Sequence, residues 1–508
     1  MTRLAEPPIT VNGSRQNRRE LATTGVAWIA IGFVALELTV APRYGFHRDE
    51  LYFLACARHL QWGFVDQPPF VPAVAWIATH VLGTSPSALR LVPALAGGGS
   101  VVLTALMAQE LGAGRKGQLL AALAAATSPV LLAGFHLLST TAFDLFFWSA
   151  TTFVVLRLLR TGDDRLWVVV GALAGLGLLN KLNIGFLLGA LAVGLVLDHR
   201  GRMFRSRWLW MGAALALALW LPNIVWNAQH DWAAVAMLRS LHNENGGIGA
   251  IVGFIPSQAI VVGPVLIVFW IAGLRRTLAS PFARPLGLAY LVLLAVFTLA
   301  GAKSYYLGGM YFVLFAAGGA WAEERLDRKH PPRGLRGWVA LMLTGAVLAL
   351  PLTLPVLPEH TLATGPWEGK INKDLSATVG WKSFTAQVAD VAKTLPPHER
   401  RSVVVFAGDY GAAGAIDLWG HQFGLPHAVS GHNSYWWWGP AHASTGATTI
   451  AVDLPRSYLL TIFSQVTPAG TVTTPHNVWS EERGDQIWIC RGQHTTWQRA
   501  WPAARQYG

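Results

Sequence analysis

Long apolar stretches separated by short polar segments fill the first 357 residues of the chain. A helix needs an apolar run of about 17–25 residues to cross the hydrocarbon core of a bilayer, and eleven stretches approach this length. We therefore expect about eleven transmembrane helices. Their predicted ranges are 22–41, 86–111, 117–135, 140–159, 166–181, 183–198, 208–227, 249–272, 284–301, 305–321 and 337–357.

The segment 42–85 joins the first two predicted spans and is long enough to fold. It holds a helical stretch that ends near Trp62, and then a second apolar stretch up to about Leu82. The second stretch is too short for a comfortable crossing, so we expect a helix that lies at the membrane interface.

The pattern changes after residue 357. Residues 358–508 lack a run of spanning length and hold 11 Lys/Arg and 11 Asp/Glu. Strand-like segments occur at 402–407, 448–452 and 486–490, and helical stretches at 383–394 and 412–419. Strands and helices of this kind are typical of a small α/β domain. We expect such a domain at 358–508, after a transmembrane domain at 22–357.

The composition supports a membrane protein. Of the 508 residues 53% are hydrophobic and only 13% are charged, about half the charged fraction of a typical soluble protein. The net charge of +12 would suggest nucleic-acid binding only if the cations gathered on one water-facing module. They lie in short clusters between apolar runs, which disfavours a nucleic-acid partner. Two cysteines, Cys56 and Cys490, exclude a disulfide framework, and only their distance decides whether they bridge loop and tail.

The basic clusters predict the orientation of the chain. The first 21 residues are polar, carry four arginines and precede a span without a cleavage site, which indicates a retained anchor with a cytoplasmic N-terminus. The segments that then face the cytoplasm hold 21 Lys/Arg, whereas outer and embedded positions before residue 358 hold seven. This is the bias expected of cytoplasmic loops. The tail and the loop 42–85 are therefore extracytoplasmic, and the positive charge meets lipids of the inner face.

Candidate chemistry lies mainly in the loop 42–85, where a carboxyl group beside low-dielectric surroundings can act as a general base. The loop contains His47-Arg48-Asp49-Glu50-Leu-Tyr52, Ala57-Arg58-His-Leu-Gln-Trp-Gly and Asp66-Gln67-Pro-Pro. Further motifs are Ser139-Thr-Thr-Ala-Phe-Asp144, Gly177-Leu-Leu-Asn-Lys181, Lys303-Ser-Tyr305-Tyr306, Gly408-Asp-Tyr-Gly-Ala-Ala-Gly414 and Gly431-His-Asn-Ser-Tyr-Trp-Trp-Trp-Gly439.

These motifs, in this order, resemble the GT-C membrane glycosyltransferases, and in particular the bacterial family 39 group akin to protein O-mannosyltransferases and aminoarabinose transferases. The resemblance covers nearly the whole chain. It implies a multi-pass α-helical GT-C fold with an extracytoplasmic α/β domain. It also implies inverting transfer of a sugar from a polyprenyl-phosphate donor to a hydroxyl of a protein, lipid or glycan acceptor at the outer membrane face. By resemblance, Asp49 is the catalytic base and Glu50 the neighbour that positions or tunes it.

The leaving lipid phosphate of such a reaction needs positive charge more than a general acid. We expect Lys303, beside Tyr305 and Tyr306, to contact that phosphate first. The further candidates for binding the donor or the acceptor are Arg48, Arg58, Lys181, Asp66 and Gln67. At the place of Gln67 related lipid A transferases often carry lysine, and glutamine supplies no charge.

Some relatives use a divalent metal ion and others use none. If an ion is used here, Asp49, Asp144 and His47 would form its ligand set, and its identity stays open.

Simpler roles compete with these assignments. Asp66 would cap the helix that starts at Pro-Pro, Lys181 and Lys303 would be snorkelling lysines, and His47 would be a structural histidine. The tryptophans of 431–439 suit sugar stacking or a core or interface belt, and 408–414 suggests a phosphate loop only weakly.

Two other functions compete with sugar transfer. A membrane transporter or flippase of a lipid-linked or cell-envelope solute would show internal repeats and charged residues at mid-membrane. The chain shows no repeat, and most of its outer acids lie at span ends. A structural or polymer-binding membrane protein gives no reason to place Asp49, Glu50, Asp66 and Asp144 on one side.

Overall fold

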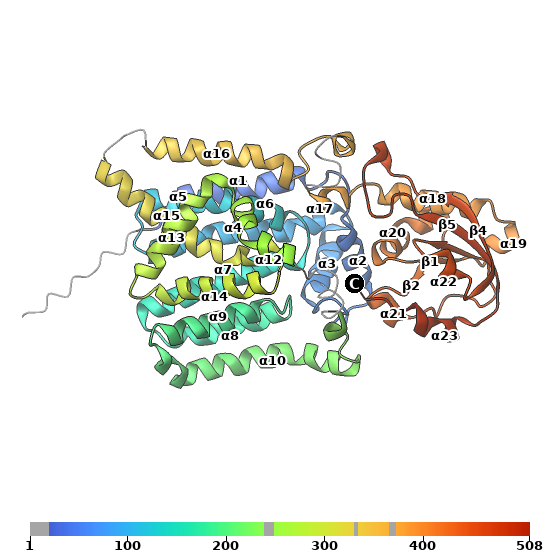
Figure 1. The fold of residues 1–508 in the computed structure, drawn as a ribbon, viewed down its shortest axis with the longest axis horizontal. Coiled ribbons are helices and arrows are strands. Elements are labelled where there is room, and N and C mark those ends of the chain that lie inside the picture. Colours follow the sequence, from blue (N-terminus) through green and yellow to red (C-terminus); the bar gives the residue numbers. More distant parts are fainter. Residues whose placement is uncertain (1–19, 238–247, 330–333, 365–371, 508) are drawn as a thin grey trace, which may run out of the picture.

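The computed structural model describes residues 20–237, 248–329, 334–364 and 372–507. Figure 1 shows a helical bundle with a smaller α/β domain, orange to red, at one end. The helices α2 (Arg48–Arg58) and α3 (Phe70–Leu82) of the first loop lie between the two parts. The predicted fold class is confirmed. Residues 1–19 of the predicted N-terminal segment 1–21 lie outside the described residues.

Every predicted span corresponds to helical structure in the described ranges, but not every one is a single helix of spanning length. Within the described ranges, five helices are long and apolar enough to cross a membrane, or up to seven spans if each bent helix pair counts as one. The five are α1 (Thr23–Val40), α4 (Pro86–Glu110), α7 (Thr140–Thr161), α10 (Arg207–Gln229) and α16 (Gly334–Thr353). Shorter apolar helices are α8 (Leu166–Leu178), α9 (Ile184–Leu197) and α14 (Arg284–Leu299), and the longer α15 (Gly308–Lys329) ends in charged turns.

Two predicted spans are bent where proline interrupts the helix. The bend is 58° between α5 (Arg115–Thr127) and α6 (Pro129–His136), and 94° between α12 (Ile248–Val262) and α13 (Ile267–Ala279). Proline has no N–H to continue the helical ladder. The two breaks meet, because the Ser128 hydroxyl donates to the Val262 carbonyl at 3.1 Å. The freed backbone group is thus satisfied inside the protein.

The end of the bundle away from the tail is joined by ion pairs. Lys116 Nζ lies 2.9 Å from Asp327 Oδ1, and Arg276 Nη1 lies 2.6 Å from Glu324 Oε1. These residues come from segments that the charge pattern predicts to be cytoplasmic. The bundle therefore has one ion-paired basic end and one end that meets the tail.

The tail contains one five-stranded sheet of order β2-β1-β3-β5-β4. Strands β2, β1 and β3 are parallel, and β5 and β4 run antiparallel to their neighbours. The strands are β1 (Val404–Ala407), β2 (Ala428–Ser430), β3 (Thr449–Val452), β4 (Phe463–Thr471) and β5 (Gln486–Gln493). Strands β1, β3 and β5 match the predicted segments. Strand β2 has only three residues and the edge strand β4 is mostly exposed, so neither shows an apolar run.

Helices cover both faces of the sheet (Figure 1). Buried residues of α18 (Trp381–Lys393) and α20 (Tyr410–Trp419) pack on one face in the same core as α2, whereas Trp497 and Trp501 pack on the other. The short helices of the tail are α17 (Lys373–Ser376), α19 (Pro397–Arg400), α21 (Ser434–Trp438), α22 (Arg456–Leu459) and α23 (Trp497–Ala500).

The tail docks on the loop through a close contact of α20 with α2. A Cβ atom on Gly414 would lie 3.0 Å from the Leu51 carbonyl carbon and oxygen, so this glycine lets the two helices approach. The small residues of 408–414 thus serve helix packing. Cys56 and Cys490 are both buried and free, so they do not bridge the loop to the tail.

Candidate active site

The His47 motif starts α2. His47 is the N-cap, its Nδ1 accepts the Asp49 N–H at 3.1 Å, and Glu50 Oε2 accepts the His47 N–H at 2.8 Å. This reciprocal arrangement is a capping box. It holds the first turn of α2, and with it Asp49, in a defined conformation.

Glu50 is fully buried and bound by Arg90 of α4. Arg90 Nε donates to Oε1 at 3.0 Å and Nη2 donates to Oε2 at 2.7 Å, and the Leu138 N–H donates to Oε1 at 3.1 Å. Arg90 also donates to the carbonyls of Ala41 and Gly45. Glu50 is therefore inaccessible to substrate and anchors α2. Sequence reasoning missed Arg90, although a charge inside an apolar span is itself evidence of a buried partner.

Asp49 faces a cavity. Its side chain is 40% exposed, and the cavity that it lines has a volume of about 370 Å³. Tyr410 of the tail donates its hydroxyl to Asp49 Oδ1 at 2.8 Å, and Arg48 Nε lies 3.8 Å from the same atom. An accessible carboxylate held by two neighbours is the arrangement that a general base needs.

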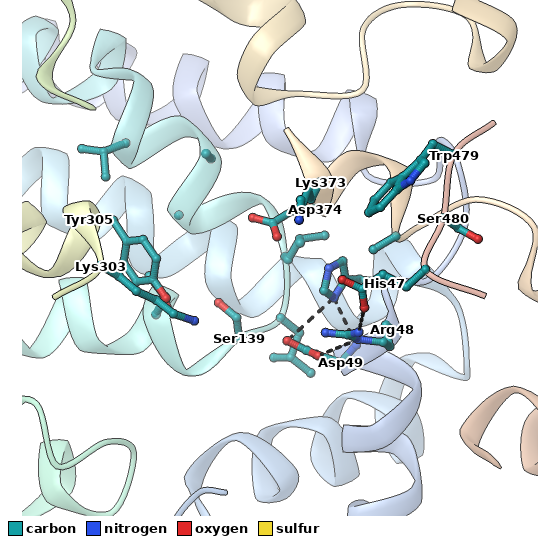
Figure 2. Close-up of a pocket in the computed structure, with 18 of the residues that line it drawn as sticks. His47, Arg48, Asp49, Ser139, Lys303, Tyr305, Lys373, Asp374, Trp479 and Ser480 are labelled. Atoms are coloured by element: carbon teal, nitrogen blue, oxygen red, sulfur yellow. Dashed lines mark hydrogen bonds and ion pairs between the residues drawn. The ribbon is translucent and has the colours of Figure 1, made fainter. Parts of the chain in front are cut away.

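The cavity lies where the bundle, the first loop and the tail meet. Figure 2 shows Lys303 and Tyr305 of the bundle on one side, Trp479 and Ser480 of the tail on the other, and Asp49 between them. Lys303 is exposed, and no carboxylate of the described residues lies within ion-pair distance of it. A cation without a partner at the mouth of a cavity suits an anionic group of a ligand.

Lys181 and Asp144 form a polar cluster beside this side of the cavity. Lys181 Nζ lies 5.0 Å from the ring centre of Tyr306 and 5.7 Å from that of Tyr305. Asp144 is buried, accepts the Asn183 side-chain N–H at 2.7 Å, and is close enough to Lys181 for their charges to interact. The structure thus brings four predicted residues together near Lys303.

Asp66 lies near Asp49 but outside the lining of the cavity. It accepts the Tyr52 hydroxyl at 2.9 Å, and the rings of Tyr52 and Tyr410 are 4.8 Å apart. Two tyrosines with tilted, contacting rings therefore lie between the carboxylates of Asp66 and Asp49. The side chain of Gln67 is buried, and neither of its amide atoms has a hydrogen-bond partner in the described part of the chain.

Arg58 does not reach the cavity. It lies at the other end of α2, where it donates to the Asp417 carbonyl at 3.1 Å and lines a second cavity beside α3. The helix α3 exposes Trp76, Ile77 and Val81, as expected of a helix at a membrane interface.

The structure does not gather the predicted metal set into one cluster of described residues. His47 Nδ1 accepts the Asp49 N–H, whereas Asp144 lies beside Lys181. Among the residues that the structure describes, no group of three or more His, Cys, Asp or Glu is able to hold a metal ion.

The tryptophans of 431–439 serve packing. Trp436 Nε1 donates to the Trp501 carbonyl at 3.0 Å, and Trp437 Nε1 donates to the Tyr507 hydroxyl at 2.9 Å. The Trp438 ring stacks on His59 at 4.3 Å. This segment joins the tail to the loop.

Comparisons with known proteins point to one class. Residues 66–226 match the family model described as Dolichyl-phosphate-mannose-protein mannosyltransferase. ArnT from Cupriavidus metallidurans bound to undecaprenyl phosphate is similar in structure, with a TM-score of 0.63, 14% identity, and 92% of this chain and 98% of that chain covered. Its apo state has a TM-score of 0.61 with the same identity and coverage. No curated protein matches by sequence. The likeness to ArnT shows a shared fold.

Proposed function

Since the chain has the GT-C fold of membrane glycosyltransferases and matches the mannosyltransferase family over residues 66–226, we propose that it is an inverting glycosyltransferase. The family-model match over residues 66–226 and the fold shared with ArnT support this proposal. The enzyme moves a sugar from a polyprenyl-phosphate donor to a hydroxyl acceptor. The undecaprenyl phosphate of the similar ArnT structure supports this kind of donor.

One observation carries this proposal: a single cavity holds an accessible carboxylate, Asp49, and a cation, Lys303, that has no ion-pair partner among the described residues. Asp49 accepts the proton of the acceptor hydroxyl as the oxygen attacks the anomeric carbon. The bond from that carbon to the phosphate oxygen breaks, and polyprenyl phosphate leaves with the bonding electrons. Lys303 stabilises the negative charge of the leaving phosphate, and Asp49 then releases its proton to water.

The other residues have supporting roles. Tyr410 and Arg48 orient Asp49, and the buried Glu50 positions α2. Tyr305 lines the cavity beside Lys303. Lys181 contacts the ring of Tyr306 next to the bundle side of the cavity but is not itself part of the lining. The apolar walls at Val130, Ala133 and Leu137 suit the first isoprene unit of the donor.

We further propose that the cavity opens at the outer face of the cytoplasmic membrane. The basic, ion-paired end of the bundle lies away from the tail, and basic residues favour the cytoplasmic side. The N-terminus is then cytoplasmic and the tail extracytoplasmic. Membrane lipids contact exposed apolar side chains such as Val252, Ile260 and Leu348.

The test is release of polyprenyl phosphate, measured by mass spectrometry after purified protein is incubated with lipid-linked sugars and an extract of envelope acceptors. We expect acceptor-dependent release, reduced at least about 100-fold in Asp49→Asn because a general base contributes about 10²–10⁴-fold. The matched control is Asp390→Asn, an exposed aspartate paired with Lys393 on α18, which should keep wild-type activity.

Absence of release from wild type together with an unaffected Asp49→Asn variant would remove the basis of the proposal. A different result would favour the transporter interpretation. If proteoliposomes move a solute and Asp49→Asn abolishes that movement, the transporter interpretation holds instead.

A further inference from the structure

The two sides of the active-site cavity differ in chemistry. The bundle side is apolar apart from Lys303, Tyr305, Ser139 and Thr141. The tail side is polar and is lined by Lys373, Asp374, Trp479, Ser480, Glu481 and Glu482. Figure 2 shows Asp49 between the two sides, with Asp374 and Trp479 on the tail side. If the bundle side takes the donor, the tail side remains for the acceptor.

The two cations on the tail side of the cavity, Arg48 and Lys373, have different contacts. Arg48 is ion-paired with Glu481 and lies 3.8 Å from Asp49. Lys373 Nζ lies over the Trp479 ring, 5.5 Å from its centre. Arg48 is therefore committed to carboxylates, whereas the ammonium hydrogens of Lys373 are available to a ligand.

Carboxyl groups outnumber these cations. Asp374 is exposed, and no Lys or Arg of the described residues lies within ion-pair distance of it. Glu481 is exposed, and burial raises the pKa of Glu482 to about 7. Asp374 and Asp49 repel an anionic acceptor, and like-charge contacts of this kind discriminate between ligands.

The same groups suit a neutral sugar. Carboxylates accept hydrogen bonds from hydroxyls, and the Lys373 ammonium and the Ser480 hydroxyl donate them. The indole of Trp479 offers an apolar face with a polar edge, which matches the mixed faces of a sugar ring. None of the sheet strands contributes a lining residue among the described ranges, so an extended peptide finds no strand edge to pair with.

We propose that the tail side of the cavity is an acceptor subsite for an uncharged glycan, with Trp479 and Asp374 as its sugar-binding residues. The acceptor is then a sugar hydroxyl, not a phosphorylated head group or a protein side chain. This inference rests on the proposed function, because it assigns the remaining side of the same cavity.

Binding of methyl α-mannopyranoside and methyl α-arabinofuranoside to the full-length protein in detergent tests the inference, with saturation-transfer NMR as the readout and no donor present. We expect saturation transfer to at least one of these neutral glycosides, reduced at least about fivefold in Trp479→Ala and in Asp374→Ala. Asp390→Ala, which changes an exposed aspartate of α18, should bind as wild type. Because Asp374 is exposed, its variants are expected to fold, and thermal unfolding verifies this.

A charge reversal gives a second readout. Asp374→Lys should weaken glycoside binding and allow mannose 6-phosphate to bind. The inference is overturned if wild type binds mannose 6-phosphate or a threonine peptide more strongly than the neutral glycosides, or if Trp479→Ala and Asp374→Ala both bind as wild type.

The two proposals fail separately. Glycoside binding without any acceptor-dependent release of polyprenyl phosphate would overturn the proposed function and leave the subsite. Release that depends only on a phosphorylated or peptide acceptor would overturn the subsite and leave the function.

Discussion

Arg90 and Glu50 form a two-point ion pair that is closed to solvent. Their side chains are 1% and 0% exposed, with Nε to Oε1 at 3.0 Å and Nη2 to Oε2 at 2.7 Å. The pair joins α4 to the first turn of α2. Asp49 is the residue before Glu50, so the place of the proposed base depends on a contact inside the protein.

Arg90→Met should destabilise the protein by about 3–5 kcal/mol, because it leaves the Glu50 carboxylate buried without its partner. Denaturant-induced loss of the folded state in detergent measures this. The control is Lys393→Met, which breaks the exposed pair with Asp390 and should change stability by less than about 1 kcal/mol. Equal stability of Arg90→Met and wild type would contradict a structural role for the pair.

Tyr410→Phe should lower kcat/KM about tenfold or more. Its hydroxyl donates to Asp49 Oδ1 at 2.8 Å and orients the carboxylate, and a misplacement of about 1 Å can cost about 100-fold in rate. Tyr435→Phe is the matched control, since it removes a similar bond to Asp417 at 2.9 Å outside the cavity lining. Steady-state release of polyprenyl phosphate gives kcat/KM for both variants. An equal loss of kcat/KM in Tyr410→Phe and Tyr435→Phe would mean that Tyr410 contributes only to folding.

Lys303→Met should raise the KM for the lipid-linked donor about tenfold, because no other described Lys or Arg lines the bundle side of the cavity. Lys303→Arg keeps the charge and should retain most of the affinity. Lys393→Met is the control for loss of a surface lysine. If the donor KM is unchanged in Lys303→Met but raised in Lys181→Met, the phosphate does not bind at Lys303. It would then bind deeper in the protein, beside Tyr306.

The tail should become less stable as the pH rises. Burial, and then the neighbouring Asp485, Asp409 and Glu482, raise the pKa of Asp453 to about 8, against about 3.9 in an unfolded chain. The folded state therefore holds a proton that the unfolded state has released, so stability falls from about pH 4 and the loss is complete above about pH 8.

Thermal unfolding at pH 5.5 and pH 8.5 measures this dependence. Asp453→Asn should show a smaller decrease in Tm between these values than wild type, whereas Asp390→Asn should show the wild-type decrease. A wild-type Tm that increases from pH 5.5 to pH 8.5 would contradict the protonated state of Asp453.

The length of the apolar runs predicted where the helices lie, but not where these helices bend or by how much. Pro129 and Gly263-Pro264 mark the two bends in the sequence, but the bends contact each other through Ser128 and Val262, which are 134 residues apart. Hydropathy within one window contains no information on such a contact.

The candidate site was predicted in part. Successive residues of a helix point about 100° apart, so Asp49 faces the cavity while Glu50 is buried, a difference that adjacency in sequence does not reveal. Arg58 is ten positions from Arg48 on α2, which is about 15 Å along the helix, and a shared loop does not make it a neighbour of Asp49. Tyr410 and Trp479 come from the tail and have no local pattern that links them to the loop.

The contact of Tyr410 with Asp49 joins residues 361 positions apart. During synthesis the first loop is made long before α20, so a ribosome-bound chain with its helices already inserted has the base but not the residue that orients it. On the proposed function, transfer of sugar is therefore slow in a partly made chain and reaches its full rate after the tail has folded onto the first loop.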